Sequence, residues 1–162
     1  MSPYLRPATF KDGFTLISNL RKEDREEVEG IGSSPLHIPF GILHSEQSVS
    51  FFNEEGDLAG IAGVVRLDDS VGQIWMLCTP AIQLNPHTFV RRARKWLSGA
   101  EKEYRLLWNL ADSRNHMHHK LLKLLGFKAL RLVPVGPQNL HYLEIVKLCA
   151  NQSQHQQQPL LV

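Results

Sequence analysis

The sequence predicts a single α+β domain, with an α/β mixed sheet at its centre and helices on either side. Composition is the first observation: of 162 residues, 43% are hydrophobic and 21% are charged, which is typical of a globular protein with a substantial core. The second is that strand-like and helix-like segments alternate along the chain. The third is a unit near the C-terminus, where a strand at 106–111, a capped helix, a Gly-Phe pair and a strand at 127–133 follow one another.

The N-terminal third is predicted to be mainly helical. After a short strand at 5–7, Thr9 and Asp12 have the spacing of a capping box and open an amphipathic helix that reaches Leu20. Residues 21–29 are charged almost throughout, which predicts a second, exposed helix. Residues 33–45 are rich in Pro, Gly and Ser and predict a loop, with or without a helical turn.

The middle of the chain predicts an antiparallel meander followed by a long helix. Strand-like runs at 48–52, 58–67 and 73–78 are separated by turn signals. A helix over 86–103 follows, with Asn85 as its cap and Pro86 at the first position, where the missing N–H costs nothing.

The C-terminal unit gives the most specific pattern. Apolar residues recur at helical spacing from Met117 to Leu125, Asn115 is placed to cap the helix with its side chain, and Gly126 is placed to end it. A last strand is expected at 140–148, and the Gln-rich tail at 151–162 is expected to be disordered. The predicted order is therefore β, α, α, β, β, β, α, β, α, β, β, in one domain over 1–150.

This order, with an Asn eleven residues before a Gly-Phe pair, resembles the GCN5-related N-acetyltransferase (GNAT) family over residues 3–148. The resemblance implies a GNAT-like acyl-CoA N-acyltransferase fold and a binding site for acetyl-CoA. It places Gln83, Asn85 and Thr88 in the loop that would hold the pyrophosphate, and Asn115 at the helix start nearby. These four are the residues expected to contact acetyl-CoA if it binds.

Two features depart from that family pattern. The loop at 79–88 contains no glycine, and Pro86 removes a backbone donor where N–H groups should converge on the anion. Leu122 stands where many members carry a tyrosine that can protonate the departing thiolate. The leading hypothesis from the sequence is therefore that no catalytic residues and no cofactor remain. An active acetyl-CoA-dependent N-acetyltransferase is the alternative.

A narrower resemblance involves the N-terminal segments. Leu-Arg-Pro-Ala-Thr at 5–9, with the Leu20-Arg21, Asp24 and Glu27 spacing, is similar to internal virion protein A-like proteins of short-tailed phages. That resemblance implies a noncatalytic virion or assembly protein in the virion or the host cytoplasm. Its partners would be portal, tail or internal core proteins, with a homo-oligomer also possible. A nucleic-acid-binding or host-protein-binding module is the third hypothesis.

Charged side chains supply the candidate partner-binding surfaces. Arg21, Asp24 and Glu27 lie at i, i+3 spacing, so they form either a solvated salt-bridge ladder or a docking surface. A basic helix face, with Arg91, Arg92 and Lys95, either faces solvent or makes non-specific contacts with DNA phosphates.

Three further observations concern metals, thiols and membranes. His116, His118 and His119 lack the carboxylate or thiolate that would complete a metal site, so we expect no metal. Cys78 and Cys149 lie in apolar runs and are expected to be reduced core thiols. No apolar run approaches the roughly 20 residues of a membrane span, so no membrane association is expected.

Overall fold

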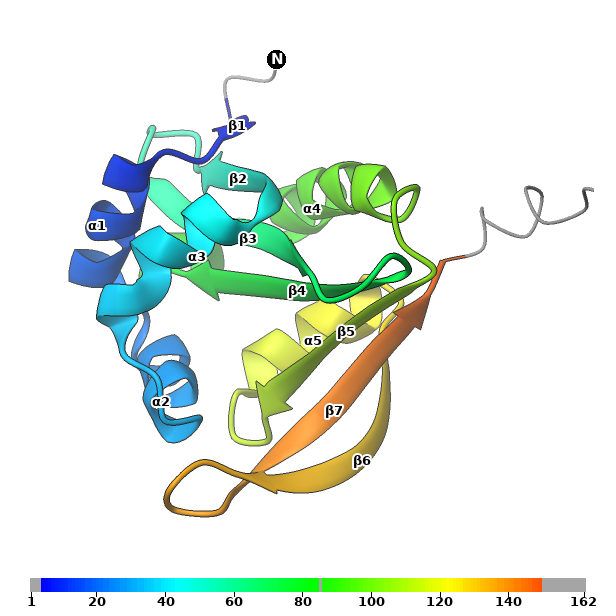
Figure 1. Cartoon of the computed structure of the whole chain (residues 1–162). Helices are drawn as coiled ribbons and strands as arrows, with labels where there is room; N and C mark the ends of the chain where they lie inside the picture. The colour runs from blue at the N-terminus through cyan, green and yellow to red at the C-terminus, as the bar shows by residue number, and fades with distance from the viewer. Residues whose placement is uncertain (1–3, 85, 150–162) are drawn as a thin grey trace, which may run out of the picture.

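The computed structural model describes residues 4–84 and 86–149, without the side chains of residues 83, 84 and 86. Within these ranges one mixed sheet has helices on both faces (Figure 1). Its strands are β1 (Leu5–Pro7), β2 (Glu46–Phe52), β3 (Leu58–Arg66), β4 (Val71–Cys78), β5 (Leu106–Asp112), β6 (Lys128–Val135) and β7 (Leu140–Leu148). The helices are α1 (Phe10–Asn19), α2 (Lys22–Gly30), α3 (Ile38–His44), α4 (Pro86–Ala100) and α5 (His116–Leu124), with 3₁₀ turns η1 (Pro35–His37) and η2 (Pro80–Leu84).

The strand order is β1-β2-β3-β4-β5-β7-β6. All neighbouring pairs are antiparallel except β4 and β5, which run parallel at the centre. The predicted meander, β2 to β4, is confirmed, and so is the α+β class with its mixed sheet. The parallel pair arises because α4 carries the chain across one face of the sheet between β4 and β5.

The two faces of the sheet support separate hydrophobic cores. On one face α4 and α5 bury Leu97 and Leu121 against strand residues that include Ala62. On the other, α1 and α3 bury Leu16 and Ile42 against Ile61. Adjacent residues of β3 therefore serve different cores, as the alternation of a strand requires. Both faces are covered near the centre of the sheet, so β3 is buried over most of its length.

Several local predictions are confirmed. Thr9 and Asp12 form the capping box at the start of α1. Pro86 is the first residue of α4. Gly126 ends α5 with φ +91°, a conformation that a side chain disfavours. Cys78 and Cys149 are free and buried. The predicted Asn85 cap and the 151–162 tail lie outside the described residues.

Three local predictions are wrong. Residues 33–45 are not mainly loop: η1 and α3 occupy most of them, because Ile38 and Ile42 lie one turn apart and bury against α1 and β3. The face of α2 expected to be solvated is buried, as described below. Asn115 precedes α5 but makes no side-chain cap, because its side chain is oriented so that Nδ2 donates to Asp24 and Glu27. None of the helices within the described ranges is both long and apolar enough to cross a bilayer.

Candidate functional site

The parallel strands β4 and β5 separate partway along their length. They pair from Val71 to Gln73 on β4, and the pairing stops opposite Trp108. At that point the side chain of Asn109 replaces the ladder. Its Nδ2 donates to the Ile74 carbonyl at 2.6 Å, and its Oδ1 accepts from Gln73 Nε2 at 3.3 Å. Beyond this wedge lies a gap between residues 74–78 and 109–112, which we call the splay.

The edge of β4 that faces the splay has backbone groups available for a ligand. The Cys78 N–H bonds to Asp24 of α2 and its carbonyl bonds to Arg21 just before that helix, rather than to Gly60, its partner on β3. Its backbone therefore points away from β3 and into the splay. The direction of the N–H and C=O groups alternates from one residue of a strand to the next. Met76 lies two residues before Cys78, so its N–H and C=O also point into the splay. An extended chain containing amides could pair there as an added strand would.

The first turn of α2 closes the far end of the splay. The Arg21 N–H donates to the Cys78 carbonyl at 2.9 Å, and Asp24 Oδ2 accepts the Cys78 N–H at 2.7 Å. Arg21 Nη1 also lies 3.1 Å from Asp24 Oδ1, which confirms the i, i+3 ion pair. These side chains are 4% and 5% exposed, so α2 presents them to the protein interior.

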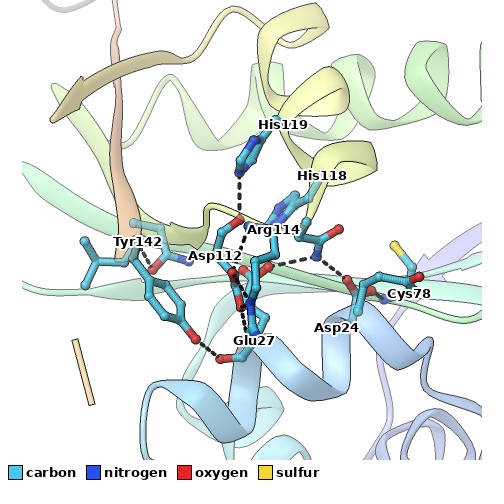
Figure 2. Close-up of polar contacts among 12 residues, drawn as sticks. Asp24, Glu27, Cys78, Asp112, Arg114, His118, His119 and Tyr142 are labelled. Atoms are coloured by element: carbon cyan, nitrogen blue, oxygen red, sulfur yellow. Dashed lines mark hydrogen bonds and ion pairs between the residues drawn. The ribbon is translucent and has the colours of Figure 1, made fainter. Parts of the chain in front are cut away.

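A buried polar cluster joins α2 to α5 above this turn (Figure 2). Asn115 Nδ2 donates at 2.8 Å both to Asp24 Oδ1 and to Glu27 Oε2. His118 Nδ1 lies 3.3 Å from the same Glu27 oxygen. Both hydrogens of the Asn115 amide are used, which fixes its orientation because two carboxylates cannot face its oxygen. Asn115 Oδ1 is buried without a partner among the described residues.

The cluster changes the proton affinities of its acids and its base. Burial raises the pKa of Asp24, against the opposing charges of His118 and Arg21. Burial alone would lower the pKa of His118. The charge and hydrogen bond of Glu27, together with the charge of Asp24, outweigh that effect and raise the pKa of His118 above its ordinary value. The imidazolium form of His118 is therefore more stable relative to the neutral form than it would be in water.

Two cavities meet at the splay. One, of about 320 Å³, lies on the α2 and α3 side and is lined by Glu27, Tyr142 and residues of β4 and β5. The other, of about 30 Å³, lies on the α4 and α5 side and is almost wholly apolar. Five residues line both cavities, namely Trp75, Met76, Asn109, Leu110 and His118. Side chains in the splay therefore line cavities on both faces of the sheet.

Neighbouring polar residues hold the end of β5 but do not line these cavities. Asp112 is buried and accepts two bonds from Arg114 Nε and Nη2, which outweigh the effect of burial and lower the pKa of Asp112. His119 Nε2 lies 2.7 Å from the Asp112 carbonyl oxygen. His118 and His119 are therefore adjacent in sequence but point to different surroundings (Figure 2).

The loop before α4 offers few donors to an anion. The N–H groups of Thr79, Ala81 and Ile82 bond to Ala59, to the Thr79 hydroxyl and to the Thr79 carbonyl respectively. Thr88, in the first turn of α4, lines a cavity of about 250 Å³ that also contains Glu54, Glu55 and Arg92. Among the residues expected to contact acetyl-CoA, Thr88 and Asn115 are thus placed, and they are not in one cavity. The side chain of Gln83 and all of Asn85 lie outside the described residues.

The other candidate residues fall in different places. Leu122 is buried and lines the apolar cavity, one turn beyond His118. A groove of about 810 Å³ between α4 and the β1–β2 edge is lined by Arg91, Arg92 and Lys95. Binding of a partner at this basic surface stays a prediction. The expectation that Arg21, Asp24 and Glu27 face solvent is wrong, because they form the buried cluster. Within the described ranges no group of three His, Cys, Asp or Glu side chains is placed to hold a metal.

Sequence reasoning missed the residues that define this site. Neither Met76 nor the pairing of Glu27 with His118 was predicted. The available signal was the helical spacing of His118 and Leu122, which places a titratable side chain one turn from the position where the family tyrosine is absent. Nothing in the sequence brings Glu27 to His118, since 91 residues separate them.

No family model matches the chain, and no curated protein matches it. Solved structures do. A GNAT-family acetyltransferase from Streptococcus pneumoniae matches with TM-score 0.61 and 16% identity, over 89% of this chain and 97% of that one. A GNAT-family acetyltransferase from Bacillus anthracis matches with TM-score 0.66 and 13% identity, over 89% and 93%. A phosphinothricin acetyltransferase from Sinorhizobium meliloti, solved with acetyl-CoA, matches with TM-score 0.67 and 15% identity, over 90% and 87%.

These comparisons establish the class of structure. The chain has the GNAT fold, as the Asn-to-Gly-Phe spacing indicated. At these sequence identities the structural similarity shows only that the fold is shared. None of these comparisons supports the predicted resemblance to phage internal virion proteins.

Proposed function

We propose that this chain is an N-acetyltransferase that uses acetyl-CoA as the donor of the acetyl group. The splay carries the proposal. It combines an open β4 edge at Met76 with cavities on both sides of the sheet that share five lining residues. A donor that lies along one side and an acceptor amine that enters from the other would meet between β4 and β5.

The residues fit different parts of acetyl-CoA unequally. The N–H and C=O of Met76 suit the amide-containing arm, which can lie beside β4 as an extra strand. The loop lacks glycine, and most of its described N–H groups have internal partners. The backbone donors nearest to a bound pyrophosphate would be those at the start of α4, because a helix directs its first N–H groups toward an anion at its N-terminus. We therefore expect the donor to be held mainly at the splay and only weakly through its phosphates.

The other cavity fits an acceptor amine. Glu27 contributes a carboxylate to its wall, and Trp75 and Tyr142 contribute aromatic surface. A cationic amine would be attracted by the carboxylate and by the ring faces. Reaction requires the neutral amine, which attacks the thioester carbonyl carbon so that a C–N bond forms as the C–S bond breaks.

A charge substitution tests donor binding. Thr88→Glu places a carboxylate at the N-terminus of α4, where it suits the helix dipole but repels phosphate. We expect calorimetry to show saturable acetyl-CoA binding by the unaltered chain, with a dissociation constant below about 1 mM, the upper end of common KM values. Thr88→Glu should weaken binding about tenfold, equivalent to about 1.4 kcal/mol.

The matched control is Ser98→Glu, which adds the same charge on an exposed residue near the other end of α4. It should leave the affinity unchanged. Absence of saturable binding at 1 mM, the ceiling stated above, would refute the proposal. The virion hypothesis, which rests on the N-terminal motif, would then lead again, and mass spectrometry of purified particles would test it.

A further inference from the structure

We propose that His118 carries the proton that acetyl transfer must move from the amine nitrogen to the thiolate sulfur, with Glu27 as its positioning residue. This inference rests on the proposed function and assigns that site a proton-transfer group. Such a group is needed because Leu122 occupies the position where a tyrosine would act.

Position is the first argument. His118 lies one helical turn before Leu122 on α5, and both side chains line the cavity on the α4 and α5 side. His118 also lines the cavity on the other face, which we assign to the acceptor. No other ionisable side chain among the described residues lines both cavities. One imidazole can therefore reach the sulfur on one side and the nitrogen on the other.

The bonding of the ring is the second argument. Nδ1 lies 3.3 Å from Glu27 Oε2, and Glu27 is itself held by the amide of Asn115 at 2.8 Å. A carboxylate at Nδ1 keeps the proton on that nitrogen. Within the described part of the chain no group bonds to Nε2, so this nitrogen is left to exchange a proton with a ligand. The His118 side chain is 12% exposed, so it lies against the buried cluster and has little contact with solvent.

The step balances with one proton. The step begins once the bound amine has released its ammonium proton to water, so that the amine is neutral while His118 is the imidazolium. As the amine nitrogen bonds to the carbonyl carbon, the electron pair of the C–S bond leaves on sulfur and takes the proton from Nε2. The neutral imidazole then removes a proton from the new amide nitrogen. His118 returns to its starting state, and the products are the N-acetyl amine and the thiol of coenzyme A.

The groups that face His118 favour the starting imidazolium. From α2, Glu27 and Asp24 contribute negative charge and Arg21 opposes them. From β4 the neighbouring titratable group in the cluster is Cys78, whose pKa burial raises well above its ordinary value, so the thiol stays neutral. Tyr142 of β7 and His37 of η1 line the same acceptor cavity, and burial raises the pKa of Tyr142.

The test follows the titration of His118 by NMR in the full chain labelled at histidine. The midpoint for His118 should lie above the value near 6.5 of an unperturbed histidine side chain, and Glu27→Gln should lower it. Coenzyme A should move this midpoint, whereas desulfo-coenzyme A, which lacks the thiol, should leave it unchanged. His119 is the matched control, because it bonds to the Asp112 carbonyl and lines neither cavity. The ring signals of His119 should respond to neither ligand.

The outcomes separate this inference from the proposed function. If coenzyme A and desulfo-coenzyme A both bind and give the same titration curve for His118, the inference is overturned and the acetyltransferase proposal stands. Failure of coenzyme A to bind would overturn both. A further check uses His118→Gln, which should still bind coenzyme A saturably and lose the pH dependence of acetylation, while His119→Gln keeps it. Loss of binding in His118→Gln would show a structural role instead.

Discussion

Asp24 offers the sharpest test of the buried cluster, because its carboxylate joins three elements. It accepts bonds from Arg21 just before α2, from the Cys78 N–H on β4 and from the Asn115 amide before α5, at 3.1, 2.7 and 2.8 Å. Asp24→Ala leaves all three donors without this partner. Removing one member of a buried ion pair costs about 3–5 kcal/mol, since the remaining charge is uncompensated.

The expected loss lies at the lower end of that range. Arg21 keeps a contact with Glu23 at 3.4 Å, which partly compensates the guanidinium. We therefore expect Asp24→Ala to lower the free energy of unfolding by about 3 kcal/mol. In a domain of this size each kcal/mol lowers Tm by about 2–4 °C, so Tm should fall by about 6–12 °C.

Urea denaturation and thermal melting at pH 7 measure the two quantities. Glu23→Ala is the control, because Glu23 is a half-exposed partner of the same arginine and exposed pairs contribute about 1 kcal/mol or less. If Asp24→Ala stays within 1 kcal/mol of the unaltered chain, with the same dependence on urea, the reasoning about the cluster is refuted.

Two further predictions concern local features. Hydrogen bonds from Arg6, the Thr9 N–H and Ser50 outweigh burial and lower the pKa of Asp12 to about 2. Because this lies below the unfolded value near 3.9, the stabilisation is complete above that value and is lost as pH falls toward 2. Asp12→Asn should therefore cost at most about 2.6 kcal/mol at pH 7, and this cost should shrink as pH falls toward 2 and vanish below it; a cost independent of pH would contradict this. Gly126→Ala should lower the free energy of unfolding by about 1–2 kcal/mol in urea denaturation, because φ is +91° at this position. Gly99→Ala, inside α4, should instead raise it by about 0.5–1 kcal/mol. A change in the same direction for both variants would contradict this reasoning.

The local rules of the sequence were sufficient for most elements. The Thr9–Asp12 spacing determined where α1 begins, Pro86 marked the start of α4 and Gly126 marked the end of α5. Each depends on backbone geometry within a few residues, and that geometry is encoded by the residue itself. The alternation and length of the apolar runs likewise predicted the meander and the last strands.

The sequence misled where a local pattern had a long-range partner. The charged run at 21–29 has the composition of an exposed helix, yet Asp24 and Glu27 are buried because Asn115 and His118 come from 88 to 91 residues away to bond with them. Helix α3 forms for a similar reason. Its Pro and Gly disfavour helix locally, and burial of Ile38 and Ile42 against α1 and β3 compensates.

By itself, then, the sequence determined the GNAT fold and all the major elements except α3, because capping, turn geometry and apolar periodicity act over short distances. It also showed that the loop glycines and the tyrosine are absent. Only the tertiary structure decided what stands in their place. It directed the backbone of Met76 into the splay, turned Asn115 from a helix cap into a donor to two carboxylates, and placed His118 between two cavities. These features depend on how α2, β4 and α5 meet, and no short segment encodes that meeting.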